Sequence, residues 1–117
     1  RVLLPQASGA REVVAAGLRE LGASVDVVEA YRNVPPEGLA EAAARVFESR
    51  VDWVTFTSGS TVKNLLAAVP REAMAGVRLA SIGPVTSEAL RRHGFRPDAE
   101  ARPHTAEGLV AAMEQRG

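Results

Sequence analysis

The sequence contains no cysteine and only two histidines. Without cysteine, disulfide bonds, thiolate metal sites and cysteine nucleophiles are excluded. The two histidines, His93 and His104, lack the spacing of a metal site, and we expect no bound metal. Basic and acidic residues are equal in number, so the formal net charge is zero. This balance argues against binding of nucleic acid or of an acidic membrane through bulk charge.

The sequence also lacks a long apolar run and a signal-peptide pattern. A helix that spans a bilayer needs roughly 20 apolar residues, and no stretch approaches that length. We therefore expect a cytoplasmic protein. What is present is a chain of 117 residues, of which 46% are hydrophobic. These values are typical of one globular domain, residues 1–117, that buries a core of its own.

Apolar and β-branched runs alternate with amphipathic, helix-like patterns along the whole chain. The runs predict strands at residues 1–5, 24–31, 51–57, 77–83 and 98–101. The amphipathic patterns predict helices around residues 13–21, 39–47 and 62–69. A fourth helix is anchored by Ala89 and Leu90 and ends at Gly94, and a last helix follows Thr105. Five strand–helix units indicate an α/β fold with a parallel sheet and helices on both faces.

The strand order follows from connection rules. Right-handed crossovers leave few topologies, and the commonest for five units is the flavodoxin-like, doubly wound order 2-1-3-4-5. This order places the most apolar strands in the centre and the more polar second and fifth strands at the edges. We therefore expect residues 1–5 to pair beside residues 51–57. A monomer is favoured over a dimer that exchanges this first strand, because association costs translational freedom.

Three loops are expected to meet at the carboxyl edge of this sheet, where ligands of such folds bind. They read "PQASGAR", "TSGST" and "GPVTSE", and each opens a helix. Free amides and the helix dipole favour an anion there, although Ser, Thr and Gly are also ordinary helix caps. Both interpretations stay open from the residues alone. The candidate anion-binding residues are Ser8, Gly9, Arg11, Thr57, Ser58, Gly59, Ser60, Thr61, Gly83, Pro84 and Thr86.

Several familiar chemistries do not fit these loops. A phospho-acceptor receiver domain needs acidic residues where the sequence has Pro5-Gln6 and Thr57-Ser58. No GxGxxG fingerprint is present, and "ASGAR" is only a weak match to a flavin phosphate loop. A serine hydrolase needs a nearby histidine, and we expect both histidines to be surface residues away from the three loops. Tyr31 ends the second strand, either as an aromatic that shields the sheet edge or as a functional group.

The order of three motifs carries a resemblance to a known family. "VDWVTFTSGSTVKNLL" followed by "ASIGPVTSEALRRHGFRPDAEARPHTAEGLVAAM" resembles the later half of uroporphyrinogen-III synthases. The opening "RVLLPQASGAREVVAAGLRELGASVDVVEAYRNVP" is similar to the middle of the same family. The resemblance implies a role in tetrapyrrole and haem biosynthesis. The family enzyme is a lyase that closes hydroxymethylbilane to uroporphyrinogen III, with inversion of the last pyrrole ring and loss of water.

The resemblance also implies roles for individual residues. The family needs no metal or organic cofactor, so none is expected here. Tyr31 in "EAYRNVP" matches the tyrosine proposed to assist departure of the hydroxyl as water. Ser58 and Thr86 match positions that line the substrate cleft. The substrate carries many acetate and propionate carboxylates, which agrees with helix starts as its binding surface.

Length separates this chain from the family pattern. Family members are about twice as long and fold as two similar α/β domains with the substrate between them, so the chain looks like one isolated half. The half alone is then expected to be inactive, with the missing half as its partner. In the family arrangement, residues 1 to about 26 would belong to one domain, residues from about 38 onward to the other, and "VVEAYRNVPP" would be a linker strand. The alternatives are a stand-alone flavodoxin-like module that binds phosphate or flavin, or a fold fragment without catalysis.

Overall fold

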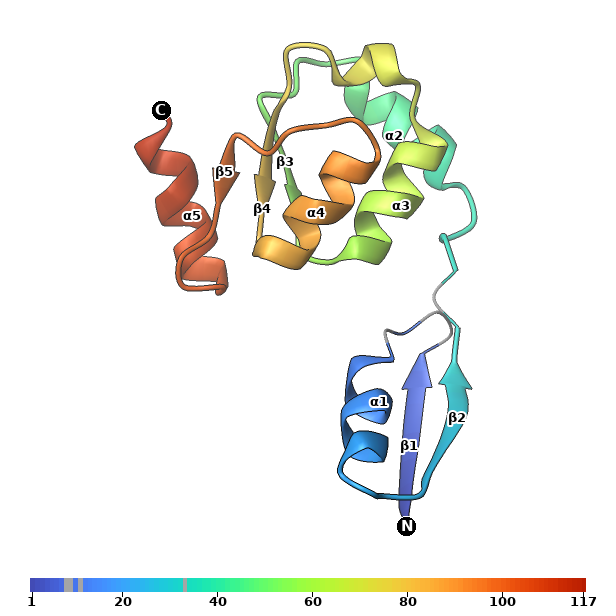
Figure 1. Ribbon diagram of the computed structural model, residues 1–117. Helices are drawn as coiled ribbons and strands as arrows, with labels where there is room; N and C mark the ends of the chain where they lie inside the picture. Colours follow the sequence, from blue (N-terminus) through green and yellow to red (C-terminus); the bar gives the residue numbers. More distant parts are fainter. Residues whose placement is uncertain (8–9, 11, 33) are drawn as a thin grey trace. The chain divides into compact units, whose positions relative to one another are not determined.

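A computed structural model describes residues 1–7, 10, 12–32 and 34–117 (Figure 1). Within these ranges the chain divides into two compact units, Arg1–Val34 and Pro35–Gly117. Both contain strands and helices, and every pairing between described strands is parallel. The α/β class expected from the alternating sequence pattern is therefore confirmed. No helix in the described ranges combines the length and apolar character that crossing a membrane requires.

The first unit is a β-α-β motif. Its elements are β1 (Val2–Ala7), α1 (Val13–Glu20) and β2 (Val25–Tyr31). The two strands pair in parallel from Val2 opposite Val25, with a register shift after Gln6. Ala15 and Val25 are buried, whereas Leu3 is 65% exposed. Parallel strands are normally covered on both faces, so the core of this unit is incomplete.

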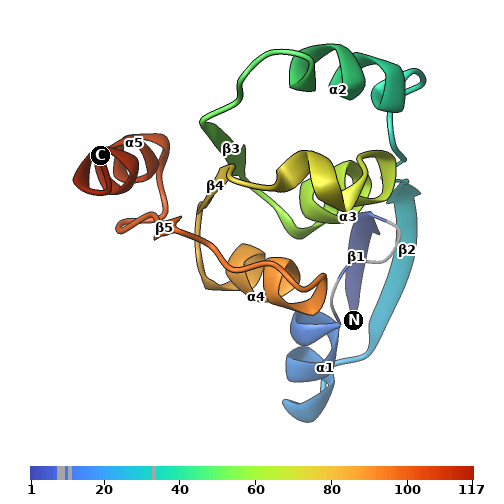
Figure 2. The same cartoon turned by 90° about the horizontal axis from the view of Figure 1, so that it is seen from above.

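The second unit holds the larger sheet. Its strands are β3 (Trp53–Phe56), β4 (Arg78–Ser81) and β5 (Ala99–Glu100), paired in parallel in that order. Its helices are α2 (Leu39–Phe47), α3 (Gly59–Ala68), the 3-10 turn η1 (Arg71–Met74), α4 (Pro84–Arg92) and α5 (Ala106–Gln115). Viewed from above, α3 and α4 lie on one side of β3 and β4, and α5 lies on the other (Figure 2).

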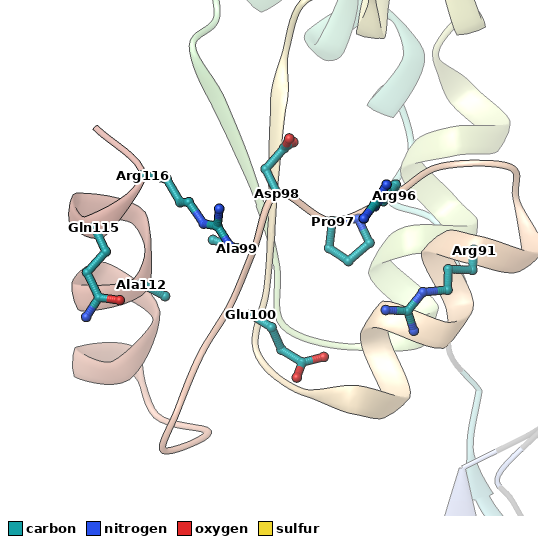
Figure 3. Close-up of a pocket in the computed structure, with 9 residues that line it drawn as sticks. All are labelled: Arg91, Arg96, Pro97, Asp98, Ala99, Glu100, Ala112, Gln115 and Arg116. Carbon is teal, nitrogen blue, oxygen red and sulfur yellow. The ribbon is translucent and has the colours of Figure 1, made fainter.

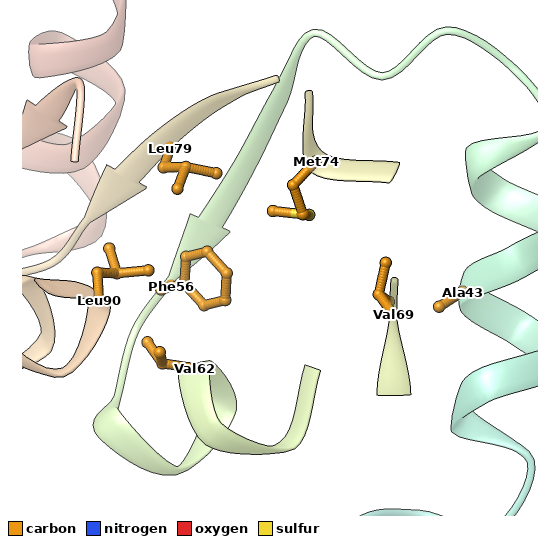
Figure 4. Close-up of a cluster of buried hydrophobic side chains, with 7 residues drawn as sticks. All are labelled: Ala43, Phe56, Val62, Val69, Met74, Leu79 and Leu90. Carbon is orange, nitrogen blue, oxygen red and sulfur yellow. The ribbon is translucent and has the colours of Figure 1, made fainter. Parts of the chain in front are cut away.

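Two buried clusters explain this layering. Side chains alternate between the faces of a strand, and β4 contributes Leu79 to one cluster and Ala80 to the other. The first cluster packs α2, α3 and α4 against the sheet through Ala43, Phe56, Val62, Val69, Met74, Leu79 and Leu90 (Figure 4). The second packs α5 through Ala80, Ala99, Ala101 and Leu109. The sheet of this unit is therefore covered by helices on both faces.

The expected single sheet of five strands is not confirmed. The described strands form two sheets, β1-β2 and β3-β4-β5, each of which is one part of the expected order 2-1-3-4-5. The expected pairing of residues 1–5 beside residues 51–57 is absent from the described strands. Apolar patterning predicts which segments become strands, but it does not choose between neighbours of similar polarity. One domain over residues 1–117, and a monomer, stay predictions.

Arg71 fixes the end of α4 that lies far from the carboxyl ends of the strands. Its guanidinium donates to the carbonyls of His93 and Gly94 at 3.3 and 2.8 Å. The same group lies 4.5 Å from the centroid of the Phe95 ring. A cation at a helix C-terminus also complements the helix dipole. The η1 turn, which the sequence pattern did not predict, thus has a clear role because it carries this arginine.

Gly108 allows the connection between β5 and α5 to lie close against α5. Thr105 caps the helix, and its side-chain oxygen accepts from the Gly108 amide at 3.0 Å. A Cβ built on Gly108 would lie 2.0 Å from the carbonyl oxygen of Pro103. Real Cβ atoms do not approach an atom so closely, so only glycine fits without a shift of the loop. The packing of the β5–α5 connection against α5 therefore explains why a glycine stands at position 108 within a helix.

We predict that Gly108→Ala destabilises the second unit, although alanine normally stabilises a helix by ~1 kcal/mol relative to glycine. Overpacking against backbone is expected to cost about 1–3 kcal/mol. Gly59→Ala is the matched control, because its Cβ would meet Ala89 at an ordinary 3.7 Å. Denaturant unfolding followed by the fluorescence of Trp53, the only tryptophan, measures both. Equal or higher stability of Gly108→Ala would contradict the packing argument.

Candidate functional site

The candidate site lies at the carboxyl edge of the β3-β4-β5 sheet. The three strands are parallel neighbours, so their carboxyl ends meet at one edge of the sheet. Two of the three loops predicted from the sequence, "TSGST" and "GPVTSE", begin there and open α3 and α4. The third predicted loop follows β1 in the first unit, and its residues Ser8, Gly9 and Arg11 lie outside the described residues.

The "TSGST" loop caps α3. Ser58 is the N-cap residue, and its hydroxyl accepts from the Thr61 amide at 3.2 Å. The Thr61 hydroxyl donates to the Ser58 carbonyl at 2.7 Å, and Ser58 Oγ lies 3.1 Å from Ser60 Oγ. The capping interpretation of this loop is therefore confirmed. The structure shows no acceptor for the amides of Gly59 and Ser60 among the described residues, as expected for a first helical turn.

The "GPVTSE" loop opens α4 in a different way. Gly83 occupies the N-cap position with extended backbone, and Pro84 follows at the first helical position. Pro84 is exposed, whereas Thr86 is only 4% exposed. In this structure the Thr86 side chain faces the interior of the unit. Gly83 is buried as well, so Pro84 and Val85 are the residues at the surface of this helix start. Substrate-binding roles for Gly83 and Thr86 stay predictions.

A buried chain of hydrogen bonds holds the start of α4. The Ser81 hydroxyl donates to the Gly83 carbonyl at 2.8 Å and accepts from the Gly83 amide at 3.2 Å. Ser87 Oγ lies 2.9 Å from Ser81 Oγ and 2.5 Å from Oε1 of Glu100. Ser81 and Ser87 are both fully buried. The network therefore fixes the backbone of Gly83 to both β4 and β5.

His104 lies at the same edge, which corrects the expectation that both histidines sit away from the loops. A Cβ built on Gly83 would lie 3.3 Å from Cγ of the His104 ring. His93, by contrast, sits at the opposite end of α4, where Nδ1 is 2.9 Å from the Ala89 carbonyl. The signal for His104 was available, since it follows the fifth predicted strand and precedes the helix cap Thr105. Glu100 was also missed, because a lone acidic residue in a weak strand gives no signal.

Tyr31 lies in the first unit, at the last position of β2 opposite Ala7. Its side chain is 62% exposed, so the phenol is not a core group of that unit. An exposed phenol fits both an aromatic that shields the sheet edge and a functional group, so both roles of Tyr31 stay predictions.

A separate cavity of about 280 Å³ lies between α4, β5 and α5 (Figure 3). Its lining residues are Arg91, Arg96, Pro97, Asp98, Ala99, Glu100, Ala112, Gln115 and Arg116. None of the site residues predicted from the sequence lines it. Asp98 accepts from the Leu79 amide at 2.8 Å, so it joins β4 to β5. In the described ranges, no group of three or more His, Asp or Glu residues is placed to hold a metal ion.

Comparison with known proteins gives one consistent result. The family model described as uroporphyrinogen-III synthase HemD matches residues 1–111. A uroporphyrinogen-III synthase of Synechococcus elongatus is 32% identical, over 98% of this chain and 47% of that protein. A protein of Methanothermobacter thermautotrophicus, named provisionally as the same enzyme, is 36% identical over 97% of this chain and 48% of its own length. The chain thus spans about half the length of these curated relatives.

The fold is similar to that of a solved structure that is also described as a uroporphyrinogen III synthase. The uroporphyrinogen III synthase of the extreme thermophile Thermus thermophilus superposes with a TM-score of 0.67 at 22% identity. The match covers 98% of this chain and 49% of that one. At this identity the superposition supports the fold, while the family model covers nearly the whole chain and decides the family. The chain belongs to the uroporphyrinogen-III synthase family.

Proposed function

We propose that this chain carries part of the substrate site of a uroporphyrinogen-III synthase, the enzyme that closes hydroxymethylbilane to uroporphyrinogen III. The observation that supports this most is the start of α3 at the carboxyl edge of the sheet, where the amides of Gly59 and Ser60 have no acceptor among the described residues. Helix starts of this kind attract anions. The acetate and propionate groups of a linear tetrapyrrole are anions of the right kind.

In this reaction, the main role of the loops that open α3 and α4 would be to orient the substrate. In the net reaction, the hydroxyl of the hydroxymethyl group and one hydrogen of the terminal pyrrole ring leave together as water, and the last ring is inverted as the macrocycle closes. Binding several carboxylates at fixed points would hold the two reacting ends in one geometry, which lowers the barrier of such a reaction. We propose that Tyr31 supplies the proton to the departing hydroxyl. Its exposed phenol is consistent with contact to a ligand.

We expect the 117-residue chain to bind a tetrapyrrole carboxylate but to form no uroporphyrinogen III. The chain spans about half of its relatives, and a misplaced substrate loses most of the rate. Titration of ¹⁵N-labelled chain with uroporphyrin III should shift the amides of Gly59 and Ser60. Inorganic phosphate is the control for a general anion site. Equal shifts with phosphate alone would favour a small-anion module, and isomer III formed above the spontaneous isomer I would contradict the expected inactivity.

Ser58→Asp separates the two roles of the α3 start. Aspartate caps a helix about as well as serine, so the free energy of unfolding should change by less than ~0.5 kcal/mol. Its charge should nevertheless weaken uroporphyrin III binding by about fivefold, because two unit charges ~4 Å apart repel by roughly 1 kcal/mol in water. Ser58→Asn is the matched neutral control and should bind as the parent chain does. Unchanged binding by Ser58→Asp would show that the loop is a cap and nothing more.

Tyr31→Phe should act on turnover rather than on folding. In a synthase of the relatives' full length that contains this sequence, loss of a proton donor should slow turnover by ~10²–10⁴-fold. The unfolding free energy should fall by no more than about 1 kcal/mol, since the phenol is exposed. Steady-state kinetics and thermal unfolding measure the two effects. A lower melting temperature with normal turnover would assign Tyr31 a structural role instead.

A further inference from the structure

The β3-β4-β5 sheet ends at β5, which pairs with β4 and with no further strand among the described residues. The Ala101 amide donates to the Ser81 carbonyl of β4 at 2.8 Å. Consecutive residues of a strand direct their backbone groups to opposite sides, so the amide and carbonyl of Glu100 point away from β4. An edge with such outward groups can accept an additional strand.

The cavity of about 280 Å³ shown in Figure 3 lies along this edge. Residues 97–100 of the β5 segment line it, together with residues of α4 and of the C-terminal part of α5. The two helices lie on opposite sides of the sheet (Figure 2). A strand added beside β5 would therefore lie in this cavity, between α4 and α5.

Three arginines line the cavity. Arg91 belongs to α4, Arg96 lies in the connection before β5, and Arg116 follows α5. All three side chains are exposed. Arg91 reaches Glu88 only at 3.9 Å, and neither Arg96 nor Arg116 forms an ion pair with any described residue. The guanidinium groups of this cavity are therefore available to a ligand.

The two carboxylates of the cavity, by contrast, have partners inside the unit. Asp98 accepts from the Leu79 amide at 2.8 Å. Glu100 accepts from the Ser87 hydroxyl at 2.5 Å, and its other oxygen lies 3.8 Å from Arg102. These contacts attach β5 to β4 and α4. The charge that remains for a partner is that of the arginines, so a partner with carboxylates fits this edge.

The positions of Arg91 and Arg116 restrict the partner further. Their side chains point toward β5 from opposite sides, one from α4 and the other from α5 (Figure 3). Side chains of a strand alternate between its two faces. In a strand added beside β5, two consecutive residues would point to the two arginines, whereas residues two positions apart would point to the same side. Contact with both arginines therefore requires adjacent acidic residues.

We propose that the β5 edge binds an extended acidic segment of a partner protein, which adds as a strand and places adjacent carboxylates at Arg91 and Arg116. The backbone of Glu100 supplies the main-chain pairing, and the arginines select the sequence. The inference does not rest on the proposed function, because the cavity shares no residue with the start of α3.

Two capped hexapeptides of equal composition test the spacing. Each contains two Thr, two Val and two Glu, with the glutamates adjacent in one peptide and separated by one valine in the other. Fluorescence anisotropy with the 117-residue chain should show about fivefold tighter binding of the adjacent form, the upper range for one exposed ion pair. Equal affinity of the two peptides would overturn the proposal.

Arginine variants test the assignment of the two sides. Arg91→Gln and Arg116→Gln should each reduce the preference for adjacent glutamates to within about twofold, because one of the two ion pairs is removed. Arg92→Gln is the matched control, since Arg92 is a neighbouring exposed arginine of α4 that does not line the cavity. It should keep the preference of the parent chain. All variants should unfold at the same denaturant concentration.

Amide shifts test whether the peptide adds as a strand. In ¹⁵N-labelled chain, the adjacent-glutamate peptide should shift the Glu100 amide, which points outward, more than the Ala101 amide, which is paired with Ser81. Binding without a shift of Glu100 would show that the arginines attract charge without strand addition. Displacement of the peptide by inorganic phosphate at the same concentration would assign a small-anion site instead. Absence of binding at millimolar peptide would also overturn the inference.

Discussion

The parallel pairing of β4 between β3 and β5 is the constraint on which the second unit depends. It aligns the carboxyl ends of three strands, so the helices that follow must begin at one edge. It also sends Leu79 and Ala80 to opposite faces, so that one strand nucleates both buried clusters. The alignment of the helix starts at one edge and the packing of the two buried clusters therefore both follow from the parallel pairing of these strands. A change that shifts the register of β4 would alter the site and the packing together.

The edge formed by the starts of α3 and α4 is shaped by helix caps of a common kind. Ser58 and Thr105 are helix caps, and both are satisfied by amides of their own helices. The cost of presenting open amides is small, because the first turn of any helix leaves them unpaired. The start of α4 differs, since a buried serine pair and a carboxylate set its geometry from below. A surface of this kind needs no rearrangement to meet an anion.

Much of the fold could be predicted from the sequence, because strands and helices of this chain have clear periodicity. The run "VDWVTFT" and the amphipathic stretch from Val62 to Val69 became β3 and most of α3. The order within each sheet also followed from connection rules. The expected pairing of β1 with β3 is not found among the described strands, and the apolar pattern of β1 would suit several partners. The η1 turn was missed as well, since the interaction that explains it joins Arg71 to residues more than twenty positions away.

The candidate site, like the fold, could be predicted in part from the sequence. The loops that open α3 and α4 carry local signals in Gly, Ser, Thr and Pro, and these placed Ser58 and Gly83 correctly at helix starts. His104 and Glu100 act through contacts with residues on another element, which no local pattern records. Local reasoning also does not give the orientation of Thr86. It lies in the first turn of α4, yet the rotation of that helix turns it inward.

The division into two units has a thermodynamic consequence. The first unit, Arg1–Val34, buries little beyond Ala15 and Val25, whereas chains below ~40 residues seldom hold a fold unaided. The second unit has two clusters of its own. One free energy of unfolding therefore does not characterise this chain. Trp53 fluorescence reports unfolding of the second unit, whereas far-UV circular dichroism averages over both units. The difference between the two melting curves therefore measures how much less stable the first unit is than the second.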